Sequence, residues 1–483
     1  MSHIIEAKNW GRGRVCWHSL PREGNIVSMP KNTDQNHGLK QGALSFSEVF
    51  AQSVANIAPS ATPALIIPLV FASAGNITWL AYAVATAAML FVTAQINTFA
   101  KRSASPGALY TFTTQGLGQQ WGTLSGWALF LAYIFTASAT IAGFTNYASV
   151  VLTALFHLQS GIGLELALMI GCVVLCAAVA WKDVQLSTRA MLLLEFAAVS
   201  LIIVLVLFFF RSGKVVDLPQ LQGTGGTFQG LRMALVLAIF SFVGFESATA
   251  LGEEAKSPLQ SIPKSVFFSV LTVGLFFTAV SYVLVLAFRS MATPLDKSAS
   301  PLLDLANVSG LPQLGIPLVV GAMIGQAACG LASINAASRV MYSMAKHGFF
   351  HSSTARTHHT HATPHIAVLV SAFVAGFMPI VLLARGVGSM DIFGYLGTIA
   401  TFGFLLSYVL VSIAAPTYLK KRNELRFKEI TTAVIAVLLL LIPIVGSIYP
   451  VPDAPYSYLP YIFLVLIAAG ALRSFWLKKT TSS

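Results

Sequence analysis

Long apolar stretches alternate with short polar segments along almost the whole chain. Twelve stretches are long enough to cross a bilayer as helices, which takes about 20 mainly apolar residues. The predicted spans are residues 46–73, 78–99, 122–155, 162–181, 186–210, 229–251, 265–288, 314–344, 365–384, 390–418, 430–449 and 457–477. The preceding residues 1–43 are polar and are predicted to form a disordered tail. The pattern therefore predicts an all-α protein with twelve transmembrane helices.

Two predicted spans contain an interruption. Residues 58–63 of the first span read Ala-Pro-Ser-Ala-Thr-Pro, and this pair of prolines is incompatible with a regular helix. The sixth span holds Gly244 and Glu246. Glycine weakens a helix by about 1 kcal/mol, and an ionised carboxylate at membrane depth costs about 3 kcal/mol. Broken helices at mid-membrane are typical of transporter binding sites, although a kinked packing helix is the alternative.

The connections suggest an internal repeat. Polar segments 101–127 and 300–312, each too polar to span, follow the second predicted helix of two successive sets. This spacing divides the chain into five-helix halves at residues 44–211 and 229–419, with a further helix pair at residues 427–479. An odd number of spans in each half inverts the second half relative to the first, as in inverted-repeat transporters.

Composition and charge agree with a membrane protein. Hydrophobic residues make up 56% of the chain, charged residues 10%, and the mean hydropathy is +0.75, whereas a soluble domain carries about 25% charged residues. Most of the 29 lysines and arginines fall in the tail and in alternate loops. By the positive-inside rule both termini are cytoplasmic in a multi-pass cell-membrane protein. The net charge of +12 then needs no nucleic acid, and no cleaved signal peptide is predicted.

Two acidic residues lie well inside apolar spans, whereas most of the 17 acids map to tails, loops or helix ends. They are Glu195 and Glu246, and no Lys or Arg lies at comparable depth. Desolvation favours the protonated form of such a carboxyl group, and intramembrane acids relay protons in transporters. A protonated structural acid, hydrogen-bonded to a neighbouring helix, is the alternative for each.

The cysteines, the histidine-rich loop and the search for enzyme motifs give no evidence of a catalytic or metal site. Of the cysteines Cys16, Cys172, Cys176 and Cys329, the middle pair shares one face of an apolar helix and is predicted to pack there. The loop with His351, His358, His359, His361 and His365 has no convergent carboxylates, so we predict no metal site. Nucleophile elbows, P-loops and paired-aspartate clusters are missing. The sequence therefore predicts neither an enzyme nor a cofactor.

Three segments resemble a known family. Residues 240–265, Phe-Ser-Phe-Val-Gly-Phe-Glu-Ser-Ala…Glu-Glu-Ala-Lys-Ser-Pro…Ile-Pro-Lys-Ser, resemble the sixth-helix signature of amino acid–polyamine–organocation (APC) permeases. Residues 105–127 resemble the link between helices 2 and 3 of that family, and residues 336–350 with Thr363-Pro364-His365 resemble the end of its helix 8. The resemblance covers residues 44–479 and implies a LeuT-like 5+5 inverted repeat with broken helices 1 and 6, plus two extra C-terminal helices.

The resemblance also implies a site between the two breaks. The first break would offer backbone N–H groups to a substrate carboxylate, and the sixth-helix break would offer carbonyls to an ammonium group. Phe240 aligns with a gating aromatic, Tyr133 with a tyrosine that lines the site, and Glu246 with a proton-coupling carboxylate. The implied substrate residues are Ile57, Ala58, Pro59, Ser60, Ala61, Thr62, Tyr133, Phe240, Ser241, Phe242, Val243, Gly244 and Phe245.

Two positions depart from the family pattern. Pro59 has no N–H to give to a carboxylate, where many members carry glycine. Glu195 lies where some proton-coupled members carry a lysine in place of sodium, which leaves the coupling ion open between proton and sodium.

The expected function is secondary active amino acid transport by alternating access, coupled to protons through Glu246 and Glu195. The alternative within the superfamily is a permease or antiporter for polyamines or other organic amines. A non-transporting membrane protein would lack the broken helices, and a major-facilitator transporter would have a long loop where residues 253–263 are short. A homodimer is left open.

Overall fold

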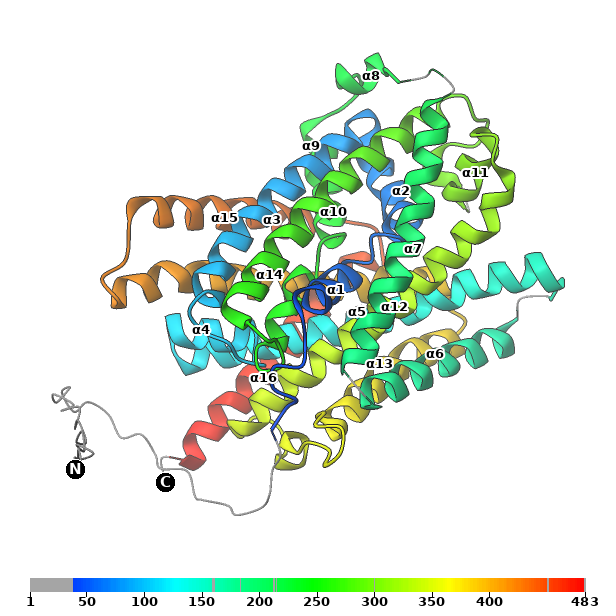
Figure 1. Cartoon of the computed structure of the whole chain (residues 1–483). Coiled ribbons are helices and arrows are strands. Elements are labelled where there is room, and N and C mark those ends of the chain that lie inside the picture. Colours follow the sequence, from blue (N-terminus) through cyan, green and yellow to red (C-terminus); the bar gives the residue numbers. More distant parts are fainter. Residues whose placement is uncertain are drawn as a thin grey trace, which may run out of the picture. The chain divides into compact units, whose positions relative to one another are not determined.

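The computed structural model describes residues 38–158, 161–182, 184–211, 213, 215–298, 300–449 and 451–481, and these are almost entirely helical (Figure 1). The first half of the chain contains α1 Phe46–Ile57, α2 Thr62–Ala74, α3 Thr78–Ala100, α4 Leu109–Leu117, α5 Gln119–Phe156, α6 Ile162–Lys182 and α7 Val184–Phe210. The second contains α8 Leu218–Leu221, α9 Phe228–Phe240, α10 Pro258–Phe288, α11 Pro301–Val308, α12 Gly315–Lys346, α13 His365–Ala384, α14 Ser389–Lys421, α15 Phe427–Gly446 and α16 Leu459–Thr481. Most of the predicted tail, residues 1–37, lies outside the described residues.

Among the described residues, 11 helical segments are long and apolar enough to cross a membrane. The predicted number was twelve. The difference lies at the start of the chain, where α1 has only 12 residues and Thr62–Ala100 forms one continuous segment through α2 and α3. The other segments match the remaining predicted spans one for one, with ends shifted by a few residues.

Two predicted boundaries were wrong. The third span was expected from residue 122, but α5 already begins at Gln119, after Gly118. The seventh span was expected from residue 265, but α10 begins at Pro258. A proline fits the first position of a helix because the N–H that it lacks has no partner there. The two polar connections contain the short helices α4 and α11.

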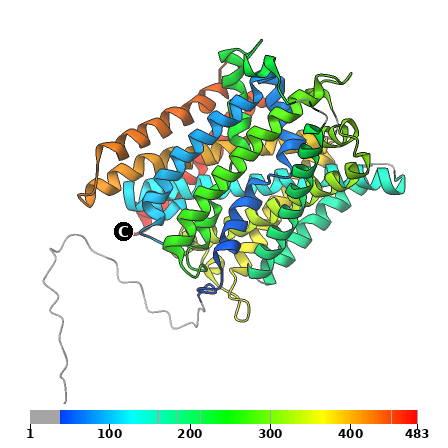
Figure 2. The ribbon, with the colours of Figure 1, turned by 45° about the horizontal axis from the view of Figure 1, so that its top comes forward.

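The centre of the bundle is built on α5, which packs against α12 and α14. Small residues allow these helices to approach closely, as is usual in membrane bundles. A Cβ atom on Gly403 of α14 would lie 2.6 Å from the carbonyl oxygen of Ala128 in α5. Around this centre α3 runs beside α10, and α15 runs beside α14 (Figures 1 and 2).

The helices on either side of the two interruptions are neighbours in space. Helix α2 packs on α9, and α1 packs on the 3₁₀-helix η2, Phe245–Leu251, which follows α9 after four non-helical residues. Segments almost 200 positions apart in sequence therefore meet where both lose regular helical structure, and Ser53 Oγ donates to the Phe245 carbonyl at 2.6 Å there.

Candidate functional site

The first interruption is a tight set of turns. Helix α1 ends at Ile57, Ala58 has a φ of 53°, and α2 begins at Thr62 with Pro63 next to it. The Ala58 N–H bonds to the Val54 and Ala55 carbonyls, and the Ala58 carbonyl accepts N–H groups of Ala61 and Thr62 at 3.1 and 3.2 Å. The turns thus pair the N–H groups of Ala58, Ala61 and Thr62 with carbonyls of the same segment, which reduces the number of open backbone groups at this break.

The remaining amides of this loop are also engaged. Pro59 has no N–H, and the Ser60 N–H points to Glu195 Oε2 at 3.4 Å. The first break was expected to offer its N–H groups to a substrate carboxylate. In this conformation, the amides of the described residues 58–62 already have acceptors within the protein.

The second interruption is organised by Gly244. Helix α9 ends at Phe240, and Gly244 has a φ of 88° before η2 begins. This left-handed conformation suits glycine. A Cβ atom there would also overlap the side chain of Asn56, which donates to the Gly244 carbonyl at 3.4 Å.

Asn56 connects both interruptions to α12. Its Oδ1 accepts the Ser333 hydroxyl at 2.6 Å, and its backbone carbonyl accepts the Cys329 thiol at 3.1 Å. Asn56 is 2% exposed and Ser333 is 0% exposed, so each bond replaces water that these polar groups would otherwise need. Asn56, which belongs to α1, is thereby held against both the Gly244 turn and α12.

A small cavity of about 30 Å³ lies between the two breaks. Its lining includes Ile57, Ala58, Ala61, Thr62, Phe240 and Val243, all of which the sequence proposed for the site. The sequence did not single out Asn56, Ile66, Thr136, Thr140, Gln326, Cys329 and Phe393, which also line it. Thr136 and Thr140 follow Tyr133 at helical spacing, so the three residues share one face of α5. This spacing could have indicated from the sequence that the two threonines line the site.

The other residues proposed for substrate binding do not line this cavity. Ser241 hydrogen-bonds to Tyr82, and the rings of Phe242 and Phe245 pack 5.5 Å from Phe277 and 5.3 Å from Tyr408. Pro59 faces a different, largely apolar cavity of about 340 Å³ that Glu195 also lines.

Phe240 separates the small cavity from a larger one. Phe240 and Phe393 line both the 30 Å³ cavity and a neighbouring cavity of about 290 Å³. Their ring centroids are 6.2 Å apart in an edge-to-face arrangement. The Phe240 ring also lies against Gly397, where a Cβ atom would approach it to 2.5 Å. The partition between the cavities is therefore this aromatic pair together with Ile66, which also lines both.

Glu246 is held by two tyrosines. Its carboxylate is 0% exposed. Tyr133 of α5 donates to Oε1 at 2.7 Å, and Tyr408 of α14 donates to Oε2. The Tyr408 oxygen in turn accepts the Gly244 N–H at 3.4 Å. Tyr133, proposed as a substrate residue, thus contacts the carboxylate, and Tyr408 is a partner that the sequence analysis missed.

Glu195 occupies a separate buried position on α7. Its side chain is 2% exposed, and no described lysine or arginine forms an ion pair with it. A Cβ atom on Gly325 of α12 would come within 2.9 Å of its Oε1. With Ser60, these contacts place Glu195 where the first break, α7 and α12 meet.

A buried ion pair closes one end of η2. Arg339 of α12 donates to Glu254 through Nε at 2.5 Å and Nη2 at 2.9 Å, and the side chains are 1% and 0% exposed. The Glu254 carbonyl also accepts the Leu44 N–H at 2.9 Å. Charges that the sequence placed in loops or at helix ends here form a fully enclosed pair.

The described histidines, cysteines and acids form no group of three that could hold a metal ion. His358 stacks on His361 with ring centroids 4.8 Å apart, and Cys172, Cys176 and Cys329 are buried free thiols. Cys16 lies outside the described residues.

Comparison with known proteins identifies relatives over most of the chain. The branched-chain amino acid permease BcaP of Bacillus subtilis is 27% identical over 366 residues, which cover 72% of this chain and 74% of that protein. Cationic amino acid transporter 4 of Mus musculus is 25% identical over 70% of this chain, which spans only 54% of that relative. The methylthioribose transporter of Bacillus subtilis is 22% identical over 66% of this chain and 68% of its own length.

The family model for amino acid permeases matches residues 49–470, which include both interruptions, Glu195, Glu246 and the Glu254–Arg339 pair. The chain therefore belongs to the amino acid permease family of the APC superfamily.

Proposed function

We propose that this protein is a secondary active permease for amino acids, with substrate bound between the interruptions at residues 58–61 and 241–244. The observation that carries the proposal is the cavity between the two breaks, lined from both. In this proposal α1 and α2 form one broken span and α3 the next, which gives twelve spans in a LeuT-like inverted repeat with two additional helices. Irregular backbone at membrane depth then lines a cavity, as the bilayer requires.

The lining favours an amino acid with an uncharged side chain. Its polar members Asn56, Thr62, Thr136, Thr140 and Gln326 carry no formal charge. The Thr136 and Thr140 hydroxyls donate to carbonyls one turn earlier, so their lone pairs remain for an ammonium group. Phe240, Phe393 and Val243 supply apolar surface. A polyamine would bring at least two positive charges to a lining with no carboxylate, so organic amines are the second candidate.

Alternating access would use the unequal closure on the two sides of the cavity. On one side Ile66 and the Phe240–Phe393 pair, which line both cavities, separate it from the 290 Å³ cavity. On the other side stand Glu246 with its two tyrosines and, beyond them, the Glu254–Arg339 pair. The positive-inside rule assigns this second side to the cytoplasm. The structure would then represent a closed state nearer to opening outward.

An uptake screen tests the function. The purified protein in proteoliposomes is given radiolabelled neutral, cationic and acidic amino acids and polyamines, with and without a pH gradient and with and without sodium. We expect saturable uptake of neutral amino acids that rises with an inward proton gradient. Uptake of polyamines alone would replace the proposal with the second candidate, and no uptake of either class would reject both.

Replacing Phe240 with alanine should weaken substrate binding by about tenfold, which corresponds to about 1.4 kcal/mol, because the ring supplies apolar wall to the cavity. The measurement is the substrate concentration at half-maximal uptake. Phe373→Ala is the matched control, since Phe373 on α13 is 70% exposed and remote from the cavity lining. If Phe240→Ala and the unmodified protein reached half-maximal uptake at the same substrate concentration, Phe240 would not be part of the binding site.

Proton coupling is proposed to act through the contacts of Glu246. An ionised carboxylate can accept both tyrosine hydroxyls, whereas a protonated one must donate from one oxygen. One tyrosine would then have to turn, and Tyr408 also holds the Gly244 N–H at the break. Proton binding would in this way alter the second interruption, which lines the substrate cavity.

The variant Glu246→Gln keeps the size of the side chain and mimics its protonated form. We expect it to bind substrate and exchange it across the membrane, but to lose accumulation driven by a pH gradient. Glu195→Gln is the matched control at the other buried acid. If only Glu195→Gln loses accumulation, the coupling roles are reversed. If both accumulate normally, neither acid couples transport to protons, which leaves sodium coupling or facilitated diffusion as the alternatives.

A further inference from the structure

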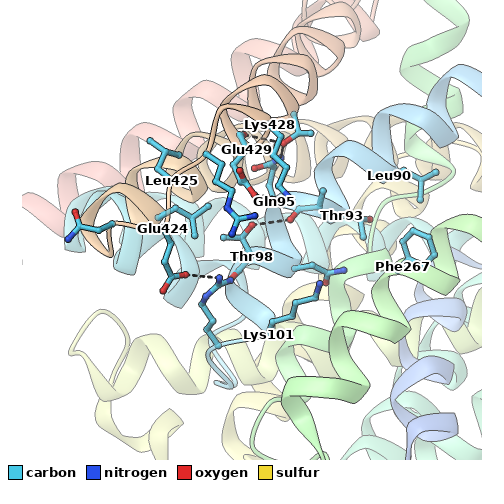
Figure 3. A pocket seen from close by; sticks show the side chains of 17 residues that line it. Leu90, Thr93, Gln95, Thr98, Lys101, Phe267, Glu424, Leu425, Lys428 and Glu429 are labelled. Atoms are coloured by element: carbon cyan, nitrogen blue, oxygen red, sulfur yellow. Dashed lines mark hydrogen bonds and ion pairs between the residues drawn. The ribbon is translucent and has the colours of Figure 1, made fainter.

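The cavity with the most charged lining lies outside the candidate site, at the end of the bundle where α3 ends and α15 begins. It has a volume of about 870 Å³ and shares no lining residue with the 30 Å³ cavity. Figure 3 shows Lys428 and Glu429 of α15 above Gln95 of α3, with Phe267 of α10 across the hollow from Leu425. The positive-inside rule assigns this end to the cytoplasmic side.

The cavity carries an excess of positive charge. Its lining has four cations, Lys101, Arg102, Arg426 and Lys428, and two acids, Glu424 and Glu429. The acids pair with two of the cations: Arg102 with Glu424 at 2.8 Å, and Lys428 with Glu429 at 3.7 Å.

Glu424 stays charged in this arrangement. Its hydrogen bonds to Arg422 and Arg102 lower the pKa of this exposed carboxyl group. None of the described residues forms an ion pair with Lys101 or Arg426. These two cations are therefore available to an anion.

Several polar atoms in the wall lack partners. Among the described residues, nothing hydrogen-bonds to Thr93 Oγ1, Asn97 Oδ1 or Glu429 Oε2, although all three atoms are buried. Thr93 is only 1% exposed and lines the cavity. Two of these atoms, Asn97 Oδ1 and Glu429 Oε2, can only accept hydrogen bonds, so they call for a ligand with donors. Buried acceptors without donors are costly, and a bound ligand would remove that cost.

The cavity also has an apolar side that continues onto the outer face of the bundle. Leu90 and Phe267 line it, and Phe267 is 41% exposed on the spanning helix α10. Next to it, Phe268 is 44% exposed. An occupant can therefore place a charged group inside and hydrocarbon along α3 and α10. A soluble anion would contact only the cationic interior, whereas a lipid would contact both the cationic interior and the apolar surface along α3 and α10.

We propose that this cavity binds an anionic glycerophospholipid whose headgroup carries hydroxyl groups, with phosphatidylglycerol as the matching chemistry. The phosphate would lie between Lys101 and Arg426, and the hydroxyls would donate to Asn97 Oδ1 and Glu429 Oε2. Basic pockets between transmembrane helices on the cytoplasmic side bind such headgroups elsewhere. Helix α15 starts here without a side-chain cap, so its first N–H groups add to the attraction for phosphate. The lipid would fasten α15 to α3 and α10.

Lipid titration of the purified full-length protein in detergent tests the proposal. Native mass spectrometry counts bound dioleoyl-phosphatidylglycerol, dioleoyl-phosphatidylethanolamine and dioleoyl-phosphatidic acid, and a thermal melt follows each titration. We expect phosphatidylglycerol to bind most tightly and to raise the melting temperature most. Equal binding of phosphatidylethanolamine would overturn the charge argument, and equal binding of phosphatidic acid would overturn the hydroxyl argument. Displacement of the lipid by millimolar inorganic phosphate would identify a soluble anion as the ligand.

The variants Lys101→Gln and Arg426→Gln locate the site. Each should weaken phosphatidylglycerol binding about fivefold, and the double variant about 25-fold, from the contribution of one basic residue near an anionic lipid. Lys182→Gln is the control, since Lys182 is an exposed lysine at the end of α6 outside this lining. Unchanged binding in the double variant would overturn the proposal. If the double variant fails to insert, the single variants decide by the same criterion.

Discussion

Replacing Gly244 with leucine should abolish uptake while the protein still inserts into the membrane. Two costs combine at this position. A side chain at a φ of 88° costs about 1–2 kcal/mol for an L-residue, and any Cβ atom there overlaps Asn56. The overlap moves either Asn56 or the turn, and both border the cavity between the breaks. Uptake of labelled substrate in proteoliposomes measures the effect.

The matched control for this variant is Gly386→Leu. Gly386 has a φ of 85° in the connection between α13 and α14, and a Cβ atom there would meet nothing within 4 Å. It therefore shares the backbone strain but not the overlap with Asn56. Uptake should survive in Gly386→Leu and be lost in Gly244→Leu. Normal uptake by Gly244→Leu would reject the site between the two interruptions.

Replacing Arg339 with leucine should destabilise the protein by about 3–5 kcal/mol, because it leaves Glu254 as an uncompensated buried charge. The melting temperature in detergent measures this loss. Arg422→Leu is the control: Arg422 pairs with Glu424 at 3.1 Å, and the two side chains are 49% and 39% exposed, so water can solvate Glu424 once the arginine is removed. Since exposed pairs contribute at most about 1 kcal/mol, the control should melt close to the unmodified protein.

The double variant Glu254→Leu with Arg339→Leu separates stability from transport. Apolar residues in place of a buried ion pair often restore stability. We expect the melting temperature to recover and uptake to stay low, since the pair stands on the proposed cytoplasmic side of the cavity. Recovery of both would mean that the pair serves stability alone. If Arg339→Leu had the same melting temperature as the unmodified protein, the pair would not contribute to stability at all.

Several features of the fold could be predicted because they depend on local composition. The length of apolar stretches located the helices, and the prolines near residue 60 and Gly244 located places where helices end. Gly244 and Glu246 stood out because neither residue suits an apolar helix. The start of α5 was misplaced because residues 119–121, Gln-Gln-Trp, are too polar for a spanning stretch yet helical.

Partners could not be predicted in the same way. Asn56, Ser333 and Tyr408 are ordinary residues for an apolar helix, and only packing shows that they contact the Gly244 turn and Glu246. Arg339 and Glu254 were counted as charges at helix ends because their enclosure depends on segments 85 positions apart in sequence. Likewise, the cations around the 870 Å³ cavity served in the sequence analysis only to predict the orientation of the protein in the membrane.

In the proposed site, the turns of the first interruption would affect how a substrate leaves. Its amides already have acceptors, chiefly the Ala58 carbonyl. A substrate carboxylate that takes one of these N–H groups must displace an existing acceptor, so the number of hydrogen bonds hardly changes and the exchange contributes little net free energy. In this proposal, substrate affinity would come mainly from the apolar wall and the ammonium contacts, and the loop would re-form its own hydrogen bonds as the carboxylate leaves. In the proposed transport cycle such a loop would lower the barrier to substrate release, and a permease that releases its substrate in every cycle depends on fast dissociation more than on tight binding.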